Sequence, residues 1–335
     1  MVVGAFLALQ LAGRVVGVVR GVFQHVLGWM CFGTKERLAR HTTTMFPLMV
    51  RIFFGLRFWV VALFAVGFSC NAQSDRGEPS ERGDFFSTWF ERVSRIQAQQ
   101  PAWMTPVFTT TPRLDEELHY DQSFQSIPGG RQINFGNTKG LELIPYYNFQ
   151  LNIGIPSYIT TTTTPRKSGW SDETFLLKYR FLAGNETNGN YVLTAFMGLS
   201  VPSGSANYSS HHYIYTPTIA GGKGWGDFDI QSTLGVALPD SLGKESGPGT
   251  PLIFNTSLQY KIAKVVWPDV EFNYTYWPNG VHENKQQLFV SPGLIFGRFP
   301  IWKRLRVVAG IGYQVAVTSR PLYHNNFDIT VRFPF

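Results

Sequence analysis

The sequence predicts an all-β transmembrane protein: an antiparallel outer-membrane β-barrel of about 12 strands, with an N-terminal signal peptide and a short amphipathic helix. Three observations predict this fold class. The C-terminal segment alternates strictly between apolar and polar residues, the extended segments before it are long enough to cross a bilayer, and the links between them are alternately long and short.

The C-terminal strand shows the alternation most clearly. From residue 325 onward every second residue is apolar, namely Phe327, Ile329, Val331, Phe333 and Phe335. Polar residues such as Asp328 and Arg332 lie between them, so the strand has one apolar and one polar face. Outer-membrane barrels close with a strand of this kind. We therefore expect its partners to be outer-membrane lipid and the barrel-assembly machinery.

Positive charge is concentrated at the N-terminus. Residues 1–72 contain seven basic residues and one acidic residue, which gives +6 of the chain's formal net charge of +7. The remaining chain is therefore almost neutral, and its composition gives no reason to expect a nucleic-acid partner.

Residues 45–72 have the features of a secretory signal peptide. Arg51 and Arg57 precede an apolar run at 58–68, and Cys70 and Ala72 occupy the −3 and −1 positions of a cleavage site. A lipoprotein acylated at Cys70 and a retained anchor are alternatives, although the apolar run is short beside the ~20 residues of a spanning helix. Cleavage after Ala72 would export the protein through the periplasm.

Residues 1–44 are either an over-extended start or an extra membrane segment, because Met45 and Met49 both stand just before the signal peptide. The true start codon among Met1, Met45 and Met49 stays open. Both cysteines, Cys31 and Cys70, precede the cleavage site, so the mature chain has none. A chain without cysteine suits passage through an oxidising compartment.

Residues 73–106 are predicted to form a periplasmic segment with one amphipathic helix at 83–99. Its apolar residues recur at spacings of three and four, and Pro101 ends it. Such a helix could plug the lumen, cap the periplasmic mouth or lie on the membrane, and a simple packing role is favoured among these.

Residues 107–335 are predicted to form the barrel. The twelve expected strands are 112–124, 138–145, 148–157, 173–182, 190–201, 211–221, 227–239, 251–262, 266–277, 285–298, 303–316 and 323–335. In 148–157, Phe149 and Leu151 share one face while Gln150 and Asn152 share the other. Most of these segments have about nine to thirteen residues, which matches tilted membrane strands better than soluble strands.

The links between the strands give an independent indication. If the C-terminus is periplasmic, the outer links are 125–137, 158–172, 202–210, 240–250, 278–284 and 317–322. The inner links are then 146–147, 183–189, 222–226, 263–265 and 299–302. The outer links are mostly longer and rich in Gly, Ser, Thr and Asn, as in bacterial barrels.

Several stretches carry a family resemblance. They are GWSDETFLLKYRFL at 169–182, MGLSVPSGS at 197–205, LELIPYYNFQLNIGIPSYI at 141–159 and VEFNYTYW at 270–277. They resemble the outer-membrane barrel family of the MetA-pathway of phenol degradation and its transporter-like members. The resemblance covers most of 107–335 and implies an outer-membrane channel for small molecules, hydrophobic or aromatic ones included. The helix at 83–99 and the N-terminal extension fall outside the family pattern.

Charged residues on the polar strand faces are expected to line the lumen and set its polarity. They are Asp115, Glu117, His119, Asp121, Glu142, Lys178, Arg180, Lys261, Asp269, Glu271, Arg306, Asp328 and Arg332. In one interpretation they pair and fill the lumen. In the other, opposed acidic and basic rims select polar solutes. If the first and last strands pair, Arg332 and Asp328 should approach the acids of the first strand.

No catalytic residue, cofactor or metal ion is predicted. His211 and His212 are adjacent and so point to opposite faces, while His119 with Asp115 and Asp121 gives only a weak cation signal. Ser257 and Ser291 have no histidine within two residues, which disfavours a hydrolase.

Aromatic residues at the strand ends are expected to form interfacial girdles. They are Tyr146, Tyr147, Trp170, Trp225, Trp267, Trp277, Trp302 and Tyr323. The expected function is a channel in the cell outer membrane for passive passage of small molecules. A structural or adhesive barrel with a filled lumen and a membrane-embedded lipid-modifying enzyme are the alternatives.

Overall fold

The computed structural model describes residues 85–136, 139–240, 247–319 and 321–335. They belong to one structural unit, Gln73–Phe335. The predictions for residues 1–44 and 45–72, and for the first part of 73–106, lie outside the described residues. None of the helices within the described ranges is both long enough and apolar enough to cross a membrane.

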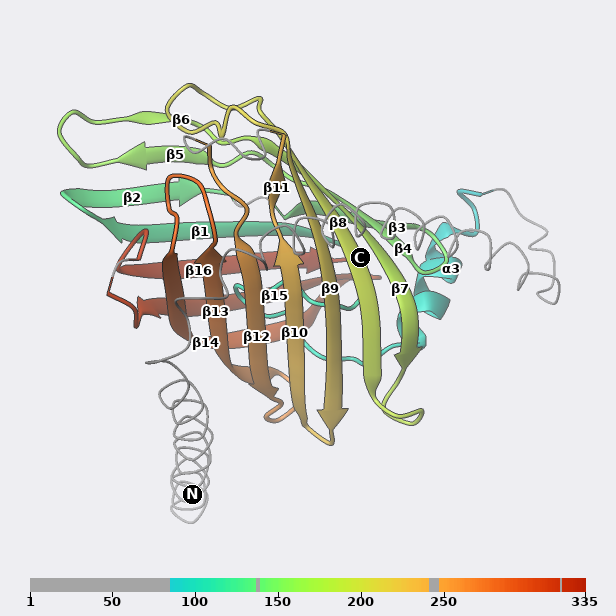
Figure 1. Ribbon diagram of the computed structural model, residues 1–335. Helices are drawn as coiled ribbons and strands as arrows, with labels where there is room; N and C mark the ends of the chain where they lie inside the picture. The colour runs from blue at the N-terminus through green and yellow to red at the C-terminus, as the bar shows by residue number, and fades with distance from the viewer. Residues whose placement is uncertain (1–84, 137–138, 241–246, 320) are drawn as a thin grey trace, which may run out of the picture. The chain divides into compact units, whose positions relative to one another are not determined.

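Twelve antiparallel strands close into a barrel, as the sequence predicts (Figure 1). In order around the wall they are β1 (Glu117–Ile127), β3 (Gly140–Tyr146), β4 (Phe149–Ile153), β7 (Glu173–Gly184), β8 (Tyr191–Val201), β9 (Ile214–Trp225), β10 (Phe228–Val236), β12 (Leu252–Tyr260), β13 (Val266–Trp277), β14 (Lys285–Trp302), β15 (Leu305–Ala316) and β16 (Asn325–Pro334). β16 then pairs with β1 through ten residue pairs, from Glu117↔Pro334 to Ser126↔Asn325. The sheet therefore has no free edge along this seam.

The wall alternates between an apolar outer face and a polar inner face. On β16, Phe327 and Ile329 are each 37% exposed, whereas Asp328 and Arg332 are 4% and 1% exposed. The same alternation continues on β12, where Phe254 is exposed and Ser257 is buried. A strand that turns successive side chains to opposite faces produces this division from its sequence alone.

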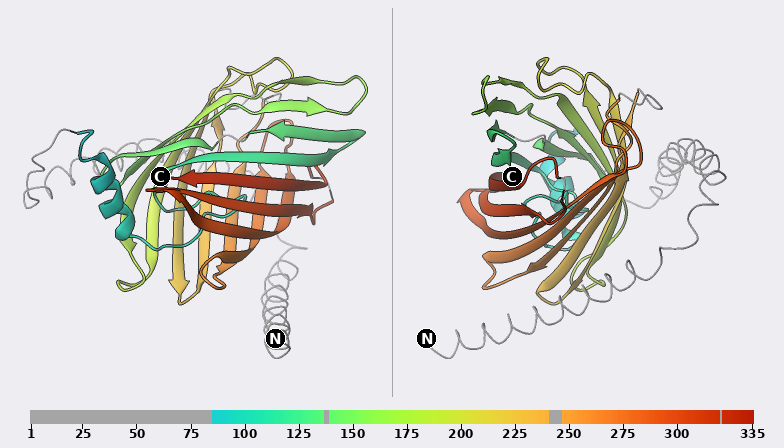
Figure 2. Two further views of the ribbon diagram at one scale, coloured as in Figure 1. Left: turned by 180° about the vertical axis from the view of Figure 1, so that it is seen from behind. Right: turned by 60° about the vertical axis from the view of Figure 1, so that its left-hand side comes forward.

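Two predicted outer loops contain strands. β2 (Gly130–Phe135) lies within 125–137, and β5 (Tyr158–Thr161) and β6 (Ser168–Trp170) lie within 158–172. β2 pairs with the far half of β1 and with β5, and β5 pairs with β6, so these strands prolong one side of the wall (Figures 1 and 2). The prediction of loops is wrong for these strands because a Gly- and Thr-rich composition also fits a strand, since β-branched Thr favours strands. A further short strand, β11 (Leu238–Pro239), pairs with β9.

The first strand also differs from its prediction. It was expected at 112–124, but it begins at Glu117, and residues 112–116 belong to a segment inside the barrel. Alternating charges at 115, 117, 119 and 121 extend the pattern of two beyond the true strand start. Periodicity alone therefore placed the start five residues too early.

The interior segment follows one helix, α3 (Trp89–Ala98), which was predicted at 83–99. This helix lies at the end of the barrel where the C-terminus also lies, and the chain after it runs between the walls before joining β1 (Figure 2). Residues Gln100–Asp115 of this chain are called the plug below.

Three of the predicted girdle aromatics point inward, because Tyr323 lines a cavity inside the barrel and two tryptophans of β13 face the same way. Trp267 and Trp277 are 2% and 7% exposed, whereas Trp225 and Trp302 are 56% and 66% exposed. The reason is parity: residues 267 and 277 share the odd-numbered face of β13 with inward Asp269 and Glu271. The face of the strand, and not the position near its end, decides whether these side chains point inward or outward.

Candidate functional site

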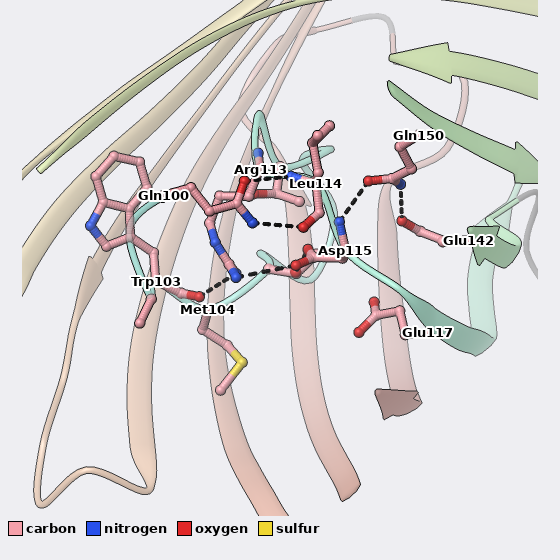
Figure 3. Close-up of polar contacts among 12 residues, drawn as sticks. Gln100, Trp103, Met104, Arg113, Leu114, Asp115, Glu117, Glu142 and Gln150 are labelled. Carbon is pink, nitrogen blue, oxygen red and sulfur yellow. Dashed lines mark hydrogen bonds and ion pairs between the residues drawn. The ribbon is translucent and has the colours of Figure 1, made fainter. Parts of the chain in front are cut away.

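The plug is a loop that enters and leaves the lumen at one narrow neck. Gln100 closes this neck, because its Nε2 donates to the Leu114 carbonyl at 2.6 Å and its Oε1 accepts from the Leu114 amide at 3.0 Å (Figure 3). Arg113 and Asp115 form an ion pair at 3.2 Å beside the same neck. Arg113 also donates to the Trp103 carbonyl, which joins the two limbs of the loop (Figure 3).

Cationic side chains of the wall bind carbonyl groups of the plug. Arg332 donates to the Thr105 carbonyl and, at 2.7 Å, to the Pro106 carbonyl. Lys178 donates to the Thr111 and Arg113 carbonyls, each at 3.3 Å. A hydrogen bond to a charged group contributes about 1.5–3 kcal/mol, so these contacts hold the plug firmly without any strand pairing.

Anionic and amide side chains bind the amide groups of the plug. Glu271 accepts from the Phe108 amide at 2.7 Å and also from the Thr109 amide. The Asp115 amide donates to Gln150 at 2.6 Å. The wall therefore supplies acceptors for plug donors and donors for plug carbonyls, so that the buried backbone is satisfied.

A small apolar cluster fixes the apex of the plug to β13, β14 and β15. Met104 and Val107 of the plug pack with Trp267, Ile295 and Val308, and Phe108 packs against this cluster. On β15, a Cβ added at Gly312 would lie 2.7 Å from the Phe108 ring and 3.0 Å from Val107. The absence of a side chain at this position is therefore what lets the plug approach the wall.

α3 spans the mouth of the barrel on the side of the neck. Arg95 donates to the Tyr147 hydroxyl at 3.0 Å at the turn after β3, and Arg304, after β14, donates to the Ser94 hydroxyl at 2.6 Å. Of the three roles considered for this helix, capping the mouth is the one that these contacts support.

An apolar cluster also attaches α3 to the wall. Val93 and Ile96 of the helix are fully buried with Leu114 and Ile144. Trp89 donates to Glu116 at 2.7 Å, and burial nevertheless raises the pKa of the Glu116 carboxyl above its ordinary value.

An outer cavity of about 320 Å³ lies on the far side of the plug from α3. Phe108, at the plug apex, forms part of its lining, and so do the residues of β1, β12, β13 and β14 that lie away from the neck. Its lining residues are Phe108, Ser123, Gln125, Asn134, Gly136, Ser157, Asn255, Asn273, Thr275, Gln287, Phe289, Gln314, Tyr323, Asn326 and Asp328.

The outer cavity is polar but almost uncharged. Amides and hydroxyls dominate its lining, and Asp328 is the single carboxylate among its described lining residues. Primary amides both donate and accept hydrogen bonds, so they suit neutral solutes that carry hydroxyl or amide groups. Phe289 and Tyr323 stack at a centroid distance of 4.5 Å and add an apolar surface to the same cavity.

Most of the predicted lumen residues lie inside the barrel. The buried ones are Asp115, Glu117, His119, Asp121, Glu142, Lys178, Arg180, Asp269, Glu271, Asp328 and Arg332. Lys261 is half-buried and Arg306 is exposed, both near the mouth that α3 spans. Lys178, Arg332, Asp269 and Glu271 contact the plug, and Arg180 donates to the Ile96 carbonyl of α3, so these charges do not face an open channel.

The expected approach of the last strand to the first is confirmed by the register. His119 stands opposite Arg332, and Ser123 stands opposite Asp328. Sequence reasoning missed the amides of the outer cavity, because uncharged residues on an inner strand face carry no distinctive pattern. It also missed the plug residues, although Pro101, Pro106 and Pro112 signalled a chain that cannot pair as a strand.

Comparison with solved structures finds barrels of bacterial outer membranes. The chain is similar to a COG4313 outer membrane channel from Pseudomonas putida F1, with a TM-score of 0.43 and 13% identity over 69% of this chain and 98% of that one. It is also similar to the beta domain of the Bordetella autotransporter BrkA, with a TM-score of 0.38 and 13% identity over 66% and 100% of the two chains. For Salmonella typhi OmpF in complex with daunomycin the TM-score is 0.33 and the identity 8%, over 65% and 96%.

No family model matches the chain, and no curated protein matches it in sequence. The resemblance to the family of the MetA-pathway of phenol degradation is therefore not confirmed. Similarities to solved structures at sequence identities of 8–13% concern the fold and give no information on a solute or an activity.

Proposed function

We propose that the protein is an outer-membrane channel whose plug closes the lumen, and that it passes small, uncharged polar solutes that enter through the outer cavity. The observation that carries this proposal is the cavity itself, which ends on the apex of the plug at Phe108. A solute in the cavity would stand directly against the segment that separates it from the opposite mouth.

The outward face of the wall supports a location in the outer membrane. Large apolar side chains are exposed along the strands, among them Ile219, Leu234, Phe254, Ile311 and Phe327. A soluble monomer rarely exposes so much contiguous apolar surface, whereas a lipid-facing barrel requires it. We extend the proposal to the two partners expected from the C-terminal strand, namely outer-membrane lipid and the barrel-assembly machinery.

The lining of the outer cavity favours one solute class. The cavity amides bond in part to one another, for example Gln314 to Asn273 and Asn326 to Gln314. Hydrophobic or aromatic solutes, which the family resemblance implies, would cover the remaining donors and acceptors of these amides without offering them a hydrogen bond. Neutral solutes with several hydroxyl groups would pair with the amides and could rest one apolar face on the stacked Phe289 and Tyr323 rings. We therefore propose sugar-sized, uncharged, hydroxyl-bearing solutes.

Passage through the lumen requires the plug to move. The contacts that hold it are side-chain hydrogen bonds and a small apolar cluster, and the plug forms no part of the strand pairing of the wall. Local rearrangement of such a segment leaves the barrel hydrogen bonds in place.

A reversible crosslink tests this mechanism. Asn273 of β13 donates to the Thr109 hydroxyl at 3.3 Å, so the double variant Thr109→Cys, Asn273→Cys places two thiols near each other in a mature chain without other cysteines. In planar bilayers, the oxidised variant should show no openings, and reduction should restore those of the wild type. A single Thr109→Cys variant is the matched control and should not respond to oxidation.

Liposome swelling tests the solute class. The reduced protein should admit an uncharged pentose faster than an anionic sugar acid of similar size. If the wild type, the reduced variant and the plug variants described below are all silent, the lumen is permanently filled and the protein is a structural barrel.

The alternative of a lipid-modifying enzyme has no specific observation in its favour. Ser257 donates to Asp269 at 2.7 Å, and Ser291 donates to Asn273 at 3.0 Å. Both hydroxyls therefore take part in the hydrogen bonds of the inner wall, and we do not assign either of them a catalytic role.

A further inference from the structure

Three buried side chains converge on the inner face of the wall beneath the plug neck. Glu117 and His119 are neighbours on the inner face of β1, and Glu142 of β3 stands directly opposite Glu117 in the strand register. Their exposed fractions are 4%, 1% and 4%. Two carboxylates facing each other across a strand pair repel, and burial increases that repulsion.

The polar atoms of the three side chains gather around one point. His119 Nδ1 lies 3.6 Å from Glu117 Oε1 and 4.0 Å from Glu142 Oε1, and the three candidate ligand atoms all lie within 4.8 Å of one another. In a tetrahedral site with bonds of about 2.0–2.1 Å, neighbouring ligand atoms are roughly 3.3–3.4 Å apart. The observed cluster is slightly wider than such a site and needs only small side-chain movements to form one.

The hydrogen bonds of His119 leave its Nδ1 without a partner. Nε2 lies 2.8 Å from Asp121 Oδ1, its shortest contact, with Thr330 Oγ1 at 3.0 Å and Arg332 Nε at 3.3 Å. The Arg332 Nε–H can only donate and the Asp121 carboxylate accepts, so the two contacts favour opposite tautomers. We assign the hydrogen to Nε2 because the contact with Asp121, at 2.8 Å, is shorter than the contact with Arg332, at 3.3 Å, and Nδ1 then carries a lone pair. Both Nδ1 and Glu117 Oε1 are buried and have no hydrogen-bond partner, and they face each other.

None of the nearby cationic side chains described below lies between His119 Nδ1 and the Oε1 atoms of Glu117 and Glu142. Lys178 approaches Glu142 through the other oxygen, Oε2, at 3.9 Å, and it also donates to carbonyls of the plug. Arg113 pairs with Asp115, Lys139 lies 4.0 Å from Asp121, and Arg332 is bound to the plug. The space between His119 Nδ1 and the two Oε1 atoms of Glu117 and Glu142 is therefore suited to a cation that does not belong to the chain.

We propose that Glu117, His119 and Glu142 bind one divalent transition-metal ion of the Zn²⁺ class. One imidazole nitrogen with two carboxylate oxygens is a ligand set that suits Zn²⁺, whereas Ca²⁺ takes six to eight oxygens. Neighbouring side chains also orient the ligands by hydrogen bonds, as around known metal sites: Asp121 fixes the His119 ring, and Gln150 donates to Glu142 Oε2.

The ion would join β1 to β3 at the base of the plug. β1 pairs with β3 only through residues 117–119 before its pairing passes to β2, so this is the shortest contact between neighbouring strands of the wall. A metal bridge between Glu117 and Glu142 would reinforce this seam. The proposal does not depend on channel activity.

The test uses the mature protein, prepared without a histidine tag, folded in detergent and stripped of metal with a chelator. The probe is Zn²⁺ alone, measured by calorimetry and by metal analysis after gel filtration. One ion per chain should bind and raise the melting temperature. His119→Ala and Glu142→Gln should each weaken affinity by more than about 100-fold, and Asp121→Asn by about 10- to 100-fold.

His212→Ala is the matched control, because His212 forms a comparable pair with Asp240 at 2.8 Å on the surface. It should leave affinity unchanged. Co²⁺ bound to the wild type should give the visible absorption of a low-coordinate site, and heat-modifiable gel mobility shows which variants are folded. The absence of stoichiometric binding by the folded wild type, or unchanged binding in folded His119→Ala, overturns the proposal.

Discussion

At the scale of single residues, the polar inner face of the barrel does more than balance its own charges. Glu271 and Lys178 each bind two backbone groups of the plug, and Arg332 binds two carbonyls from the seam strand β16. Paired charges of this kind fill the lumen by holding a second segment within it. This arrangement agrees with the interpretation of a filled lumen more closely than with that of opposed charged rims.

Gly312 gives the most direct prediction about the plug. In Gly312→Val the new side chain would overlap the Phe108 ring, because a Cβ alone already lies 2.7 Å from it. Overpacking of this kind costs about 1–3 kcal/mol, and movement of the plug apex relieves it more easily than movement of the wall. We expect more frequent channel openings in planar bilayers.

Gly221→Val is the control for this substitution. A Cβ at Gly221 would meet its nearest atom at 3.5 Å, which is ordinary contact. This variant should conduct like the wild type. Equal behaviour of the two variants would mean that the plug apex does not govern conduction.

Asp172 gives a prediction about pH at the outer end of the barrel. It accepts hydrogen bonds from the Ser210 amide at 2.8 Å, the Ser210 hydroxyl at 2.7 Å and the Gly204 amide at 3.0 Å. Burial acts to raise the pKa of the Asp172 carboxyl, but the Ser210 bonds outweigh it and hold the pKa below the ordinary 3.8. The carboxylate therefore holds residues 203–210 near neutral pH.

A lowered carboxyl pKa means that this stabilisation is present above the unfolded-state pKa and is lost as the pH falls through the folded-state value. The protection factors of 203–210, which are exchange rates corrected for the intrinsic effect of pH, should accordingly be high at pH 7 and should fall once the pH drops below about 3.8. Asp172→Asn should show low protection factors at both pH values. High protection in that variant at pH 7 would show that other contacts hold this segment.

At the scale of elements, α3 and the plug act as one unit that begins at the mouth and ends at β1. The helix is amphipathic, but the apolar residues in and just before it divide between two surroundings. Val93 and Ile96 are buried, while Phe90 of the helix and Phe86 in the turn before it are exposed. The buried pair packs on Ile144 of β3 and on Leu114 of the plug neck. Attachment of the helix and closure of the neck therefore depend on the same cluster.

Ile96→Ala tests this dependence. Truncating a buried isoleucine costs about 2–5 kcal/mol, and the loss here falls on a helix whose other contacts are side-chain hydrogen bonds rather than on the strand pairing of the wall. We expect α3 to become sensitive to limited proteolysis while the barrel keeps its heat-modifiable gel mobility. Phe86→Ala, at a residue that is 76% exposed, should change neither property.

At the scale of the whole molecule, the alternation of apolar and polar side chains predicted the wall of the barrel. The sequence of the plug, which prolines interrupt, has no periodic pattern, so the plug was not predicted. Phe327 and Ile329 revealed the outer face because lipid and lumen impose opposite requirements on alternate positions. The plug has no such pattern, because its backbone groups bind scattered wall residues such as Gln150 and Glu271 that are far away in sequence. The convergence of Glu117, His119 and Glu142 likewise depends on the register of β1 and β3, which no local pattern specifies.

The wall and the plug are separate parts of the structure, and this leads to a prediction about the role of each. The pairing of β1 with β16 and with β3 uses residues from Glu117 onward, so a shortened chain of residues 116–335 retains every strand of the wall. Its polar inner side chains would be hydrated instead of bound to the plug, and a hydrated lumen of twelve strands should conduct ions. We expect steady conductance that exceeds the brief openings of the wild type.

The oxidised Thr109→Cys, Asn273→Cys protein provides the opposite limit, with the same wall and an immobilised plug. If the shortened chain folds, as judged by heat-modifiable gel mobility, but remains silent in bilayers, the wall itself closes the lumen and the plug is only a filler. If it conducts while the crosslinked protein does not, the position of residues 100–115 controls permeability, because the two proteins differ in the plug and share the same barrel.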